Sequence, residues 1–371
     1  MTTKLKLLFT FMMTLALLFG YMFHFFPEYH FERLHIFLFN LCTGGTILLY
    51  FTENDESLSR KVSLFFILSF SYAVFSFLEL FAPAIVSAIA MVPIVEYIRI
   101  KKFSFFPKDF FTTKATTATK FHHAALLCLS IGLIISIFAI INDVYYRVLN
   151  FEKLTLNTFF LGFSFPVSLI TFSIIFSFMH KAKTSFKRIM KMASFWVINL
   201  GVIIFFIFIL FESVTMELVM SSILFIAVCN VFLMYVTMGE KEQQKNFLTS
   251  GILFLMITAI TGIVYIMLYA LNLHSPENKN LVLNFHRIIA LYGWNLSGLA
   301  VICRFRDFPI SLHSGKTILL HWIIVVLLAP LGYYYVSMGL LAVVFYAFFL
   351  KILFFSVGTS AIAPFDRSGD R

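Results

Sequence analysis

Two histidines occupy matching positions in a chain that is otherwise strongly apolar. His35 lies about four residues into one apolar segment, and His286 lies about five residues into another. An ionisable side chain inside a membrane-spanning helix is costly and usually belongs to a ligand site or a transport pathway. Two imidazoles at the same depth are suited to the two axial positions of one haem iron. This pair is therefore the first candidate for a metal-binding site.

Each histidine has an arginine close by in the sequence. Arg33 precedes His35 by two positions, and Arg287 follows His286 directly. A guanidinium group matches the geometry of a carboxylate, so these arginines are candidates to bind haem propionates. The simpler alternative is that both histidines only form hydrogen bonds at the membrane interface. Glycines that would let a macrocycle or a neighbouring helix come close follow both histidines: Gly44, Gly45, Gly293 and Gly298.

The composition is typical of an integral membrane protein. Of 371 residues, 60% are hydrophobic, 12% are charged and 50 are phenylalanine, a balance that excludes an ordinary soluble domain. The bilayer itself is then the principal partner. The net charge of +10 follows from membrane topology and does not indicate nucleic-acid binding. We expect a single transmembrane domain over residues 1–371, with no separate extramembrane domain.

Apolar runs of about twenty residues predict an all-α fold with about twelve transmembrane helices. The third and fourth segments are the least certain pair, because the fourth is short and Pro83 stands near its start. The predicted segments are 4–26, 31–51, 62–81, 82–98, 122–142, 157–179, 193–212, 214–238, 246–271, 281–303, 317–336 and 338–357.

The distribution of lysine and arginine supports this helix count. With the N-terminus in the cytoplasm, 22 of the 28 basic residues fall in inner segments and four in outer loops, while Arg287 and Lys351 lie within segments. Positive charge gathers on the cytoplasmic side of membrane proteins. Both termini are therefore predicted to be cytoplasmic, in a multi-pass protein of the inner (cytoplasmic) membrane. His35 and His286 would then lie about 6–8 Å below the outer boundary.

The remaining histidines are weaker candidates. His24, His30 and His274 belong to the outer side, and a second group belongs to the inner side next to basic residues. An inner metal site formed by His123 and His321 is conceivable, but no spacing supports it. The four cysteines lie in or beside apolar segments and form no metal-ligating motif. The inner group contains His122, His123, His180, His313 and His321.

Two short stretches resemble subunit I of the haem-copper oxidases, especially the C-type oxidases and nitric oxide reductases. Arg33-Leu34-His35 is similar to the stretch on the second helix that carries one ligand of the low-spin haem in that family. Asn284-Phe285-His286 and the later Gly293-Trp294 are similar to the family's tenth helix, where a His-x-His motif serves two haems. The resemblance implies that His35 and His286 bind one low-spin haem b and that the second and tenth helices are neighbours.

The departures from this family concern its reaction centre. Asn284 replaces the ligand of the active-site haem, and Phe165-Pro166 stands where the family has His-Pro on the sixth helix. The family's outer His-His pair is also missing, since this region reads Phe211-Glu212-Ser213-Val214. We therefore expect no copper and no centre that reduces oxygen or nitric oxide.

The sequence thus predicts a haem b protein that transfers electrons or acts as a sensor, with His35, His286, Arg33 and Arg287 at the site. A membrane redox subunit or a cytochrome is the implied partner, and the sequence does not decide whether the protein is an enzyme. The alternative is a secondary transporter without haem. A third interpretation is a haem-copper enzyme with displaced ligands, which would have to recruit His24 or His30.

Overall fold

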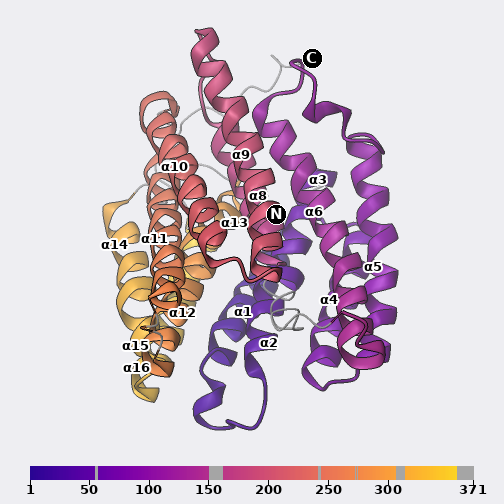
Figure 1. Cartoon of the computed structure of the whole chain (residues 1–371), viewed down its shortest axis with the longest axis vertical. Helices are drawn as coiled ribbons and strands as arrows, with labels where there is room; N and C mark the ends of the chain where they lie inside the picture. The colour runs from indigo at the N-terminus through magenta and orange to yellow at the C-terminus, as the bar shows by residue number, and fades with distance from the viewer. Residues whose placement is uncertain are drawn as a thin grey trace.

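The computed structural model describes residues 1–54, 57–149, 162–240, 244–271, 273, 275–305 and 314–356. Helices run through these residues in twelve successive segments (Figure 1). Four of the segments change between α-helical and π-helical geometry along their length and so carry several labels. The first six segments are α1 (Thr3–Phe19), α2–η2–α3 (Phe31–Ile36, Phe37–Gly45, Thr46–Glu53), α4 (Arg60–Phe77), α5 (Phe81–Lys102), α6 with η4 (Thr117–Ile140, Ile141–Tyr146) and α8 (Ser164–Ser177).

The second six segments complete the bundle. Most consecutive segments pack as neighbours, and α1 packs against α16, the last helix of the described residues. They are α9 (Ser185–Leu210), α10 (Val214–Met238), α11 (Lys245–Ala270), α12–η5–α13 (Pro276–Ile288, Ile289–Asn295, Leu296–Cys303), α14–η7–α15 (Gly315–Trp322, Ile323–Leu328, Ala329–Leu331) and α16 (Val336–Phe355).

The twelve segments correspond to the twelve predicted from hydropathy, and nine helices of the described residues are long and apolar enough to cross a membrane. The uncertain third and fourth segments are two separate helices, α4 and α5. The first residues of the sixth predicted segment lie outside the described residues. Several helices begin earlier than hydropathy indicates, because Thr116 and Thr184 accept hydrogen bonds from the backbone and start α6 and α9 within polar sequence.

The second segment lies at the centre of the bundle. Within its most apolar window, 94% of the residues are buried, compared with 28% in α9 and α11. Residues of η5 and α13 in the tenth segment are also buried almost throughout. In Figure 1, α4 and α5 lie on one side of the view, and α10 and α11 lie on the other. The apolar side chains that remain exposed on the outer helices suit contact with lipid.

Polar contacts join the second and tenth segments at three levels. Arg287 forms an ion pair of 2.6 Å with Glu32. The hydroxyl of Tyr292 lies 2.9 Å from Nδ1 of His35. Asn295 donates to Asn40 across 3.3 Å. The prediction that these two helices are neighbours is therefore confirmed, and we call this row of contacts the central seam.

The π-helical parts of the two segments meet in this seam. Phe39 of η2 packs edge-on against Tyr292 of η5, with ring centroids 5.0 Å apart. Asn40 and Asn295 also lie in π-helical turns. A π-helical turn inserts an extra residue and turns the following side chains to another face, and such turns are frequent at functional sites. Hydropathy contains no signal for this change in geometry.

The glycines near the two histidines serve helix packing. A methyl group on Gly44 would meet Val167 of α8 at 2.6 Å, and one on Gly293 would meet the ring of Phe254 of α11 at the same distance. A side chain on Gly298 would collide with Thr171 of α8. The sequence suggested that these glycines make room for a macrocycle or for a neighbouring helix. The structure shows the second role, the close approach of helices.

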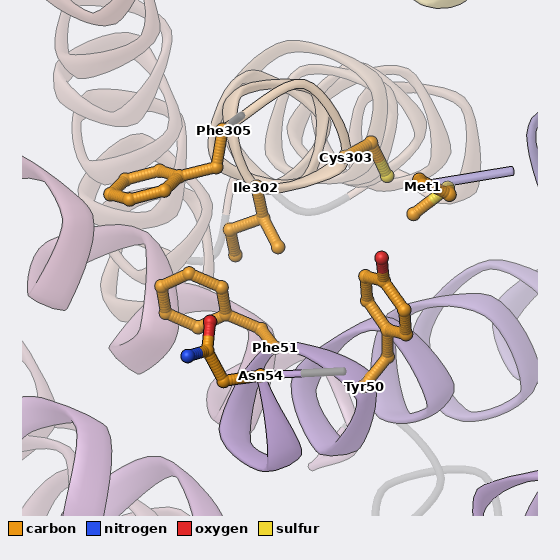
Figure 2. Close-up of a pocket in the computed structure, with 7 residues that line it drawn as sticks. All are labelled: Met1, Tyr50, Phe51, Asn54, Ile302, Cys303 and Phe305. Atoms are coloured by element: carbon orange, nitrogen blue, oxygen red, sulfur yellow. The ribbon is translucent and has the colours of Figure 1, made fainter. Parts of the chain in front are cut away.

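Both ends of the described chain lie at the same end of the bundle. Met1 lines a small pocket with Asn54 after α3 and Cys303 at the end of α13 (Figure 2). Arg304 donates hydrogen bonds to the carbonyls of Leu353 and Ser356, which brings the end of α16 to the same place. A chain that crosses the bundle an even number of times has both of its ends at the same end of the bundle. That this end faces the cytoplasm stays a prediction from the charge distribution.

Candidate functional site

His35 is buried in the central seam. Its Nδ1 lies 2.9 Å from the backbone carbonyl of Ala16 on α1, and a carbonyl oxygen can only accept. The ring proton is therefore on Nδ1, and Nε2 carries a bare lone pair. That Nε2 is buried and has no hydrogen-bond partner among the described residues. The ring of Tyr292 packs 5.5 Å away, so a side chain fills the side of His35 that faces the tenth segment.

The two arginines expected to bind propionates have carboxylate partners within the protein. Arg33 forms an ion pair with Glu79 at 3.1 Å and donates to the carbonyl of Ser76. These contacts hold the turn between α4 and α5, where Glu79 adopts a left-handed backbone with a φ of 57°. Arg287 is paired with Glu32, as described above. Both guanidinium groups therefore stabilise helix contacts in this structure.

His286 points away from the seam, toward α11. Its Nδ1 lies 3.0 Å from the carbonyl of Thr258 and 3.2 Å from the hydroxyl of Thr261. The Thr261 hydroxyl itself donates to the Thr258 carbonyl, so it presents a lone pair to the ring. Both partners accept, which places the imidazole proton on Nδ1 and leaves Nε2 bare. A hydrogen bond from the other ring nitrogen to a carbonyl is also the usual way in which a ligating histidine is oriented.

The His286 side chain lines a cavity of about 250 Å³ between α8, α9, α10, α11 and α12. The walls are mostly apolar and include several phenylalanines. A few hydroxyl groups also reach the lining, and many lining side chains remain partly exposed, so the cavity communicates with the outside of the bundle. The aromatic wall is formed by Phe165, Phe172, Phe205 and Phe206.

A haem held between His35 and His286 does not fit this packing. The two imidazoles have the same chemical form but different neighbours, α1 for His35 and α11 for His286. The bare Nε2 of His35 is sealed by surrounding atoms, and Tyr292 would have to move before iron could reach it. The structure therefore brings their helices together without bringing the two rings to a shared site.

His122, His123 and His321 have structural partners, and His274 and His313 lie outside the described residues. His321 donates through Nε2 to the carbonyl of Tyr292 at 2.6 Å and stacks on aromatic rings. His123 accepts from Arg99 at 3.0 Å, and Thr52 contacts His122 at 2.8 Å. His123 and His321 do not share a partner. Among the described residues, no group of three or more His, Cys, Asp or Glu side chains is placed to bind a metal ion.

Sequence reasoning missed the residues that orient His286. Thr258, Thr261 and Gly262 stand at helical spacings of three and four on α11, so they share one face. Gly262 leaves room for the imidazole, since a methyl group there would lie 3.4 Å from its Cε1. A Thr-x-x-Thr-Gly stretch in an apolar helix was the available signal.

Comparisons of the chain with protein-family models, curated proteins and solved structures gave no match. The resemblance to subunit I of the haem-copper oxidases therefore stays a prediction.

Proposed function

We propose that this protein is a multi-pass membrane protein that binds a small, flat, apolar molecule from the bilayer in the cavity beside His286. One observation carries the proposal. Among the described residues that line the cavity, His286 has the only imidazole, and Nε2 is its bare nitrogen because the Thr258 carbonyl holds Nδ1. An apolar cavity with one oriented polar group is the usual form of a small-molecule site.

The size of the cavity limits the ligand to one or two rings. An engineered protein cavity of about 150 Å³ binds benzene. The cavity of about 250 Å³ therefore suits a single ring with substituents or a fused pair of rings. A haem macrocycle with its four pyrrole rings exceeds this space. The second pocket, shown in Figure 2, has about 20 Å³ and holds no more than about one water molecule.

Photolabelling with a diazirine-substituted naphthalene in lipid nanodiscs tests this proposal. We expect saturable labelling of peptides from α8 and α11, competed by free naphthalene. Ala259→Phe places a ring in the cavity and should abolish the labelling. Ala82→Phe, on an exposed face of α5, is the matched control and should leave it unchanged. Labelling that is equal in both variants would overturn the proposal.

The haem predicted from the sequence is tested by an absorption spectrum of the purified protein. A bare imidazole nitrogen is also what an axial iron ligand requires. Sharp reduced-state bands that are lost in both His35→Ala and His286→Ala would establish the haem shared by two histidines. In that case Tyr292 must move from its position beside His35, and a structure of the reduced protein would show that movement.

A further inference from the structure

His286 and three hydroxyl groups on the cavity wall offer lone pairs and no free proton. The proton of the imidazole is on Nδ1, because both neighbours of that atom, the carbonyl of Thr258 and the hydroxyl of Thr261, accept. The Thr261 proton is itself used in a bond of 2.8 Å to the Thr258 carbonyl. At Nε2 a neutral His286 can therefore only accept a hydrogen bond.

Three further hydroxyl groups on the cavity wall also have their protons in use. Ser168 donates to Asn295 at 3.0 Å while accepting from the indole of Trp294 at 2.8 Å. The hydroxyl of Thr258 donates to the carbonyl of Phe254 at 2.9 Å. Ser221 donates in the same way to a carbonyl of its own helix. Each of these groups can accept one more hydrogen bond without breaking a bond inside the protein.

This pattern distinguishes two chemical forms of a flat, apolar ligand. A ring that carries carbonyl oxygens needs donors, and these cavity groups provide none without rearrangement. A ring that carries a hydroxyl group has a proton to donate, and Nε2 of His286 is the strongest acceptor available to it. A buried donor or acceptor without its partner loses affinity, so the unmatched form is disfavoured.

We infer that the cavity ligand is a phenol or a hydroquinone, bound through its hydroxyl group to Nε2 of His286. This inference rests on the proposed function, because it assumes that the cavity binds a flat molecule, and it adds the polar group of that molecule. The apolar walls contact the ring, and the partly exposed mouth of the cavity gives entry. The oxidised quinone of the same ring system binds more weakly, because its two carbonyls find no donor among these four groups.

A series of naphthalene derivatives tests the binding of the ring and the contribution of the hydroxyl group separately. Naphthol, methoxynaphthalene, naphthalene and naphthoquinone are each used to displace the photoreactive naphthalene from the wild-type protein in nanodiscs. We expect naphthol to bind roughly tenfold more tightly than methoxynaphthalene, which corresponds to about one good hydrogen bond. We expect naphthoquinone to bind no better than naphthalene.

Two variants test whether the preference for naphthol arises at His286. In His286→Phe the cavity stays apolar and the preference for naphthol should disappear, while naphthalene still binds. His180→Phe, at an exposed position, should keep the preference. If all four compounds bind the wild-type protein equally, the hydroxyl inference is wrong and the cavity proposal stands. If naphthoquinone binds best, the inference is also overturned. If none of the compounds binds, the proposed function itself fails. The wild-type series decides these outcomes even if His286→Phe does not fold.

Discussion

The central seam and the cavity contain the same chemical group in opposite surroundings. In both places an imidazole is fixed by a hydrogen bond from Nδ1 to a carbonyl of a neighbouring helix, at Ala16 for His35 and at Thr258 for His286. The bare Nε2 of His35 is sealed among packed side chains, whereas the ring of His286 borders about 250 Å³ of space. The packing around each ring decides which imidazole can take part in binding.

Matched positions in a sequence need not form one site. His35 and His286 are at corresponding depths on neighbouring helices, yet their side chains leave those helices toward α1 and α11. Residues of the seam, such as Tyr292, occupy the region between the two helices. A buried polar group with no partner is also costly, so the seam depends on its remaining contacts for stability.

The orientation predicted from the charge distribution puts both imidazoles near the outer face, and reporter fusions give an all-or-none test of it. A reporter fused after Lys181, between α8 and α9, should report the cytoplasm, and one fused after Ser275 should report the outer side. Three helices separate these sites, so the signals must be opposite. Alkaline phosphatase activity reports the outer site and green fluorescence the inner one. Identical signals would contradict the helix count.

The close helix contacts on the seam side predict the largest effect on stability. Gly298→Ala forces a methyl group into Thr171 of α8 and should lower the free energy of unfolding by about 3 kcal/mol. Gly315→Ala, whose methyl group would meet no other helix of the described residues within 4 Å, should be neutral or slightly stabilising. Thermal unfolding in detergent measures both. Equal melting temperatures would show that α8 and α13 are farther apart than described.

Substitution of His35 should mainly lower stability, whereas substitution of His286 should mainly change ligand binding. His35→Ala leaves a closed void and removes the hydrogen bond to Ala16, so it should cost about 2 kcal/mol of stability. His286→Ala enlarges an existing cavity and should cost less than about 1 kcal/mol, but it should remove the preference for naphthol. Unfolding curves and probe displacement on the same samples measure both effects. A larger loss of stability in His286→Ala, together with a lost naphthol preference in His35→Ala, would contradict this assignment.

The ion pair between Arg287 and Glu32, at one end of the seam, predicts a smaller loss of stability. Arg287→Met leaves Glu32 without its partner and should lower stability by about 1 kcal/mol, because the Glu32 side chain is 46% exposed and water screens the charge. Adding Glu32→Gln should recover part of the loss. Urea unfolding of the single and double variants gives the coupling energy. Strictly additive effects would show that the pair contributes nothing.

The fold was largely predictable from the sequence, because twelve apolar segments and their flanking charges are properties of the segments themselves. The ends of α6 and α9 were placed less well, since hydropathy does not register the capping of Thr116 and Thr184. The π-helical turns of η2 and η5 and the direction of the His286 side chain depend on contacts with other helices. Contacts between helices that are distant in the chain cannot be identified from a single sequence.

Chemical modification of the imidazoles tests the central difference between the two regions most directly. Diethyl pyrocarbonate acylates a bare imidazole nitrogen that it can reach, and mass spectrometry measures the rate at each histidine of the folded protein. This difference predicts rapid reaction at His180, whose side chain is 65% exposed, slower reaction at His286 that added naphthol suppresses, and no reaction at His35. Equal rates at His35 and His286, or an inert His286, would contradict it.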